Sequence, residues 1–95
     1  MAMTQFMTER ADVLAQVKDI LYDRDWINSS EVEKVRESSL LSRIFALDFS
    51  GQGRLDTIDS LERLYGIQLN DSEVKKMTKV SQLIDAVMEQ LEFQN

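Results

Sequence analysis

The sequence predicts an all-α protein, and three observations lead to this fold class. Apolar residues recur at helical spacing in several segments of the 95-residue chain. No segment alternates strictly between apolar and polar residues over the length of a strand. No proline-rich, glycine-rich or low-complexity stretch divides the chain. We therefore expect one domain over residues 1–95, an antiparallel four-helix bundle with a long loop before its second main helix.

The first helix is expected from about Thr8 to Arg24. Val13, Val17 and Leu21 are spaced four residues apart within it, so they share one face of the helix. The preceding residues 1–7 are expected to form a mobile tail.

A second segment is expected after residues 25–29, which break the helical rhythm. Ser30 followed by Glu33 matches a capping box, in which a hydroxyl and a carboxylate bind free amides at a helix start. Apolar residues then keep a helical period as far as Phe45, while the run 37–39 leaves open whether this segment is one helix.

The glycines in residues 48–54 predict the long loop, because glycine gives the backbone access to positive φ. A helix is expected from Leu55 to Tyr65, with Gly66 as the left-handed residue that follows its end.

After Gly66 we expect a short extended link and then two further helices. Asn70 and Glu73 are expected to cap a brief helix that runs to about Met77. An amphipathic stripe predicts the last helix from Val80 to about Glu92.

The composition excludes several classes of function. The chain has no cysteine and no histidine, which excludes disulfides, thiolate nucleophiles, imidazole bases and Cys/His zinc sites. Its net charge of −6 has the wrong sign for binding nucleic acid and favours basic partners, although acidity also simply keeps small proteins in solution. No signal peptide or membrane span is evident, so we expect a cytoplasmic protein. We also expect it to be a monomer.

The C-terminal half carries a family resemblance. An aromatic residue and a short apolar link are followed by an acidic cap, a Lys before an apolar residue, Thr-x-Val, and an apolar-apolar-Asp step: Tyr65, Ile67, Leu69, Asp71, Lys76, Met77, Thr78, Val80, Leu83, Ile84 and Asp85. Upstream, Leu55-Asp56 precedes Leu61-Glu62 and the aromatic Tyr65. This pattern resembles the acyl carrier protein family over roughly Leu55 to Val87.

The resemblance implies a carrier that has no chemistry of its own. In that family a serine at the start of the second helix is esterified to 4′-phosphopantetheine, which holds an acyl group as a thioester. The implied partners are a phosphopantetheinyl transferase and acyl-processing enzymes of fatty-acid or polyketide biosynthesis, whose basic surfaces dock on the acidic helix. Here Asp48, Asp56, Asp59 and Glu62 are the expected docking residues.

The attachment serine departs from the family pattern. Spacing from Tyr65 places Gly51 where the family's Asp-Ser-Leu triplet has its serine, and Ser50 is the preceding residue. Ser50 is the expected attachment site if the loop carries one extra residue. A literal Asp-Ser-Leu triplet around Ser60 lies inside the expected helix, where a phosphate would lose the helix terminus, so Ser60 is the weaker candidate.

Two other interpretations of the same residues remain open. Residues 48–59 approximate an EF-hand calcium loop, with oxygen donors at most of the usual positions, but Gln52 and Asp59 replace its usual donors at positions 5 and 12. Alternatively, the chain is a carrier-like interaction module without the arm, which docks on a basic partner through the same acidic residues.

Overall fold

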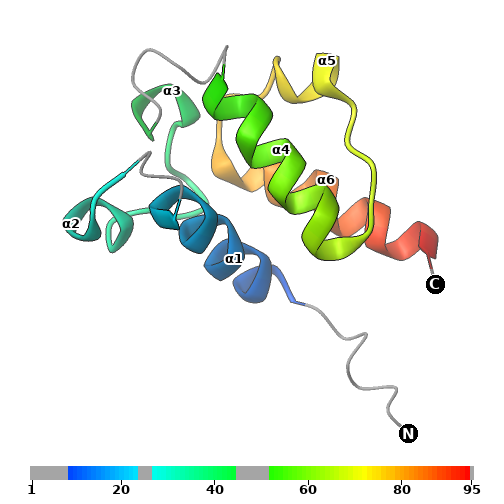
Figure 1. Ribbon diagram of the computed structural model, residues 1–95, viewed down its shortest axis with the longest axis horizontal. Helices are drawn as coiled ribbons and strands as arrows, with labels where there is room; N and C mark the ends of the chain where they lie inside the picture. The colour runs from blue at the N-terminus through cyan, green and yellow to red at the C-terminus, as the bar shows by residue number, and fades with distance from the viewer. Residues whose placement is uncertain (1–8, 24–26, 45–51, 95) are drawn as a thin grey trace, which may run out of the picture.

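The described residues of the computed structural model, 9–23, 27–44 and 52–94, are helical and contain no strand, which confirms the all-α class. Within these ranges there are three long helices and three helices of four residues each. The long ones are α1 (Arg10–Asp23), α4 (Gln52–Tyr65) and α6 (Val80–Gln94). The short ones are α2 (Ser29–Val32), α3 (Leu41–Ile44) and α5 (Asp71–Val74) (Figure 1).

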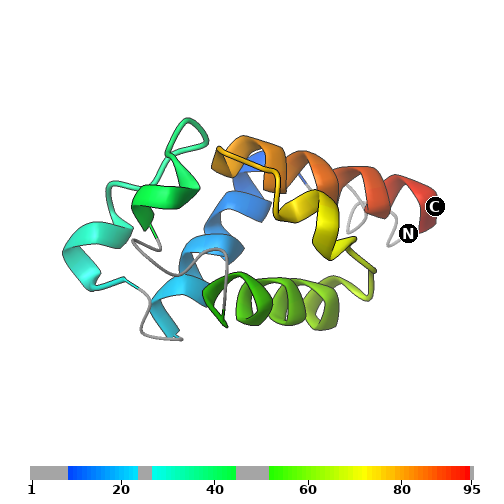
Figure 2. The ribbon, with the colours of Figure 1, turned by 90° about the horizontal axis from the view of Figure 1, so that it is seen from above.

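Helix α1 lies between α4 and α6 and contacts both of them (Figure 2). The apolar faces of these three helices meet in one core. Its buried residues on the three helices are Val13, Val17, Leu21, Ile58, Leu61, Val80, Leu83, Ile84 and Val87. Burial of each such side chain stabilises the fold by about 1.5–3 kcal/mol. The helical periodicity of the sequence therefore identified the faces that pack together.

Helix α2 begins with a capping box at a different position from the expected one. The Asn28 Oδ1 accepts a hydrogen bond of 2.9 Å from the Glu31 amide, and Glu31 Oε1 accepts one of 3.0 Å from the Asn28 amide. Ser30 only donates its hydroxyl to Asn28. The expected pairing of Ser30 with Glu33 is thus wrong. Ile27 is buried in the core and fixes where the chain enters the helix.

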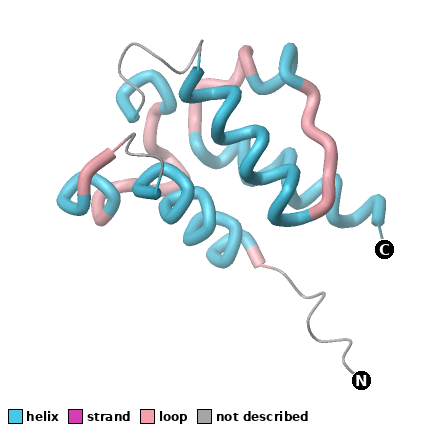
Figure 3. The backbone as a smooth tube through the Cα atoms, viewed as in Figure 1, coloured by secondary structure: helices cyan, strands magenta, loops and turns pink. Residues whose placement is uncertain are grey.

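The segment between residues 30 and 44 is not one helix, because tertiary hydrogen bonds replace the helical ones (Figure 3). The Leu41 amide donates to the Thr78 carbonyl at 2.9 Å, and the Val80 amide donates to the Ser39 carbonyl at 3.0 Å. These bonds pair the chain just before α3 with the start of α6. The interruption expected at residues 37–39 therefore occurs, and it extends over residues 33–40.

Arg10 ties three parts of the molecule together. Its Nη2 lies 2.7 Å from Glu37 Oε1 and donates to the Ser81 carbonyl at 3.2 Å, and its Nη1 pairs with Asp85. The hydrogen bonds that Arg10 donates to Glu37 and, second, to Asp85 raise the pKa of its guanidinium. Helix α1, the connection before α3 and helix α6 are joined at this point.

The elements after α4 follow the expected order. Gly66 has a φ of 65°, a left-handed conformation that ends the helix. Asn70 caps α5, because its side chain accepts hydrogen bonds from the amides of Ser72 and Glu73. Helix α5 ends at Val74, earlier than the expected Met77, and α6 continues to Gln94.

Candidate functional site

Helix α4 begins at Gln52, which corrects the expected loop over residues 48–54. The Gln52 Nε2 donates to Asp56 Oδ1 at 2.8 Å, and the Thr57 hydroxyl donates to the Gly53 carbonyl at 2.9 Å. Both are bonds between residues one helical turn apart. Gly53 is buried within the first turn of α4, so it does not belong to a loop.

Two of the expected site residues, Ser50 and Asp48, lie outside the described residues. The other expected docking residues are on α4, and each already has a contact there. Asp59 lies 3.3 Å from the Arg63 Nε, and Asp56 accepts the bond from Gln52. Glu62 Oε2 accepts a hydrogen bond of 2.8 Å from the Leu69 amide, so this carboxylate holds the link that follows α4.

The outer face of α4 combines acidic groups with the exposed side chain of Leu55, and Leu64 is a second exposed apolar residue on this helix. Leu55 is 46% exposed, and Asp59 and Glu62 follow it at the spacing of successive helical turns. Asp56 is half-buried beside them. Arg63 also lies on this face and reduces its negative charge. Such a face suits contact with a partner that presents basic and apolar groups.

Ser60 lies in the middle of α4 and is half-buried. The amides around it are within the helix, where they donate to carbonyls one turn earlier. A phosphate at Ser60 would therefore lack the free amides of a helix terminus. Ser60 therefore remains the weaker candidate for the attachment serine.

The structure is unfavourable to the calcium-loop interpretation. In an EF-hand the donors wrap around the ion, whereas residues 52–59 form the first two turns of α4. The side chains of Gln52, Asp56 and Asp59 are therefore distributed along a helix, and Gln52 donates to Asp56 instead of sharing a cation with it. Among the described residues no group of three or more acidic side chains is arranged to hold a metal ion.

A buried ion pair fixes the first turn of α4 to α5. The Arg54 side chain is 7% exposed, and its Nε lies 2.8 Å from Asp71 Oδ1 while its Nη2 donates to Oδ2 at 3.3 Å. Asp71 is 49% exposed. Sequence reasoning missed this pair because it placed Arg54 in a loop. The residues next to Arg54 in the sequence do not indicate that its partner lies 17 residues away.

Tyr65 ends α4 and is half-buried against the core. Burial raises the pKa of its phenol, and the nearby charge of Asp12 raises it further. Tyr65 therefore packs against the core, near enough to Asp12 of α1 for that charge to act on the phenol.

Comparison of the chain with protein-family models and with curated proteins yields no match. Within the described ranges, no helix has the length and apolar character needed to cross a membrane.

Proposed function

We propose that this chain is an acyl carrier protein that holds an acyl group as a thioester on a 4′-phosphopantetheine arm attached to Ser50. The observation that carries the proposal is the start of α4 at Gln52, shortly after Ser50 in the chain. The first amides of a helix have no intrahelical acceptor, and the helix dipole favours negative charge there. A phosphodiester on Ser50 would be stabilised by both effects.

The arrangement of the helices supports the proposal. Helices α1, α4 and α6 are long, and α5 is a short helix against α4. We interpret these four helices as the counterparts of the four helices of an acyl carrier protein. The stretch that resembles the family covers α4, the link after Gly66, α5 and most of α6. Helices α2 and α3 then belong to the long connection before α4.

The proposed arm fits the chemistry of the residues around the start of α4. Gln52 is exposed, so the helix start is open to a modifying enzyme. Arg54 is turned to Asp71, and this pair keeps the first turn of α4 in place. The 4′-phosphopantetheine would supply the thiol that this cysteine-free chain lacks. The chain itself would position the arm and present it to partner enzymes.

The test is the intact mass of the protein after incubation with coenzyme A and a phosphopantetheinyl transferase. We expect a mass increase of one phosphopantetheinyl group, which Ser50→Ala abolishes and Ser60→Ala leaves unchanged. An adduct that survives Ser50→Ala would assign the arm to another hydroxyl. Unmodified protein with several transferases would refute the carrier function.

A second candidate is a carrier-like docking module without the arm. The exposed Leu55 beside Asp59 and Glu62 favours it, since this face can bind a basic partner whether or not Ser50 is modified. If no adduct forms, Asp59→Asn and Leu55→Ala are the variants expected to weaken capture of such a partner. Calcium binding is the least supported alternative, and a flat calorimetric titration with calcium would dismiss it.

A further inference from the structure

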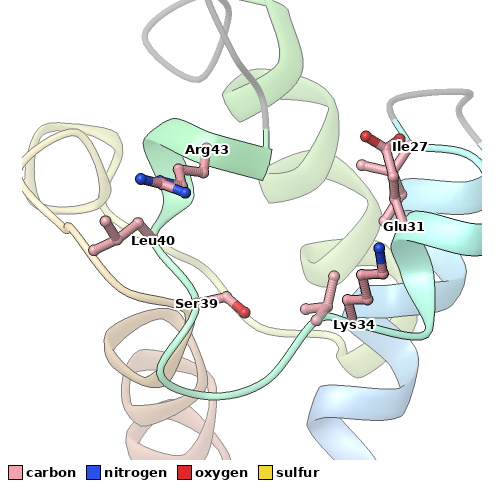
Figure 4. Close-up of a pocket in the computed structure, with 7 residues that line it drawn as sticks. Ile27, Glu31, Lys34, Ser39, Leu40 and Arg43 are labelled. Atoms are coloured by element: carbon pink, nitrogen blue, oxygen red, sulfur yellow. The ribbon is translucent and has the colours of Figure 1, made fainter.

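A groove with a volume of about 470 Å³ lies between α2 and α3. All of its described lining residues precede α4 in the chain. Figure 4 shows Leu40 and Arg43 on one side of it and Ile27, Glu31 and Lys34 on the other. Its volume falls within the range typical of small-molecule sites, about 300–1,000 Å³. The groove is separate from the acidic face of α4 described above.

Part of the groove lining is apolar. Ile27 and Val35 line it, and as core residues they are only 6% and 4% exposed. Leu40 is 40% exposed although it is a large apolar residue. Leu40 therefore provides most of the apolar surface that an alkyl chain could cover, and covering it would remove apolar area from water.

The groove also holds two cations that have no partner within the described ranges. Lys34 follows α2 and Arg43 lies on α3, so they line opposite sides of the groove, and Figure 4 draws the Arg43 nitrogen atoms beside Leu40 rather than toward Lys34. Within the described residues, neither side chain forms a hydrogen bond or an ion pair. Two unpaired cations facing one groove are notable in a chain of net charge −6. Together they favour an anion.

The remaining polar groups of the groove agree with this charge. The Ser39 Oγ accepts a hydrogen bond of 2.8 Å from the Arg36 amide, which leaves the hydroxyl proton free to be donated. Among the described lining residues Glu31 is the acidic one, and its carboxylate accepts a hydrogen bond from the Asn28 amide in the capping box of α2. The groove therefore offers hydrogen-bond donors at Ser39, Lys34 and Arg43.

We propose that this groove binds an amphiphilic anion, with a carboxylate or phosphate head between Lys34 and Arg43 and an alkyl chain against Ile27, Val35 and Leu40. An anion that contacts both cations would link α2 to α3. Binding of an anion in this groove requires neither Ser50 nor its modification. The proposal can therefore be tested independently of the carrier function. A free fatty acid and an alkyl phosphate share the required chemistry.

The experiment is calorimetric titration of the full chain with octanoate and with octyl phosphate, both below their micelle concentrations. We expect one of them to bind at a single site, more weakly as salt is added. Lys34→Gln and Arg43→Gln should each weaken binding about two- to fivefold, the range for one exposed charge contact. The matched control is Lys75→Gln, which removes the same charge at an exposed position outside the groove lining and should leave the affinity unchanged.

Three comparisons identify what the groove recognises. Octylammonium has the same chain with the opposite charge and should not bind. Inorganic phosphate should bind far more weakly than octyl phosphate if the alkyl chain occupies the groove. Amide resonances of Ile27, Val35 and Leu40 should shift on titration.

Preference for octanoate or for octyl phosphate would identify the head group. The proposal is overturned if neither anion binds, if octylammonium binds equally well, if inorganic phosphate matches octyl phosphate, or if Lys75→Gln weakens binding as much as the groove variants.

Discussion

Replacing Arg54 with Gln tests whether the ion pair at the start of α4 holds the fold together. The Arg54 guanidinium is almost completely buried and makes two bonds to the Asp71 carboxylate, at 2.8 and 3.3 Å. Hydrogen bonds to charged groups stabilise proteins by about 1.5–3 kcal/mol each, and the half-exposed Asp71 places these at the lower end because water screens it. Loss of the packed arginine stem adds to the cost.

We therefore expect Arg54→Gln to lower the free energy of unfolding by about 2–3 kcal/mol. For a domain of this size, about 1 kcal/mol corresponds to 4–8 °C in Tm, so the melting temperature should fall by roughly 10–20 °C. Far-UV circular dichroism during urea and thermal unfolding measures both quantities. The midpoint in urea should decrease by about 1–2 M.

Arg63→Gln is the matched control, because it is the same substitution on the same helix. Arg63 pairs with Asp59 at 3.3 Å, but its side chain is 79% exposed. Exposed pairs of this kind contribute about 0.3–0.5 kcal/mol. If the two variants differ by less than about 0.5 kcal/mol, burial of Arg54 has no stabilising consequence and the reasoning is wrong.

Three further predictions concern the second half of the chain. The pKa of Tyr65 is raised above the ordinary tyrosine value of 10.0, so the folded state binds the phenol proton more tightly than the unfolded state does. The resulting contribution to stability is fully present below pH 10 and is lost as the pH rises through the folded pKa. Tyr65→Phe should make the decrease in unfolding free energy above pH 10 less steep, and an unchanged slope in urea titrations across pH 9–11 would contradict this. Gly66→Ala should lower the free energy of unfolding by about 1–2 kcal/mol, because φ is 65° and no atom crowds the added Cβ, so the backbone conformation alone is unfavourable. Gly66→Asn should lower it less, since asparagine tolerates this conformation better. Equal losses in thermal unfolding would reject the backbone explanation. Asn70→Ala should cost about 1 kcal/mol through loss of the α5 cap, whereas Asn70→Asp should cost little, and chemical denaturation compares the two.

Prediction of the candidate site from the sequence was only partly possible. The spacing of Asp56, Asp59 and Glu62 placed them on one helix, and α4 carries all three. The same reasoning did not anticipate that Glu62 binds the Leu69 amide, because that contact requires the chain to turn back at Gly66. The groove between α2 and α3 was also missed. Lys34 and Arg43 are separated by a stretch for which the sequence left open whether it forms one helix, so their relative position could not be predicted.

The sequence by itself determined the elements whose information is local. Apolar residues repeat within each long helix, and that repeat fixed the buried faces of α1, α4 and α6. The left-handed Gly66 and the Asn70 cap depend on their own backbone and the next three residues, so they too were predictable.

Only the tertiary structure decided the features that depend on distant partners. The chain around Ser39 pairs with the start of α6, and this pairing ends a pattern that would otherwise continue as a helix. Arg10 pairs with Glu37, 27 residues away, and with Asp85, 75 residues away. Arg54 pairs with Asp71, 17 residues away. A charged side chain does not reveal its partner in its local sequence, because an ion pair forms wherever packing brings opposite charges together.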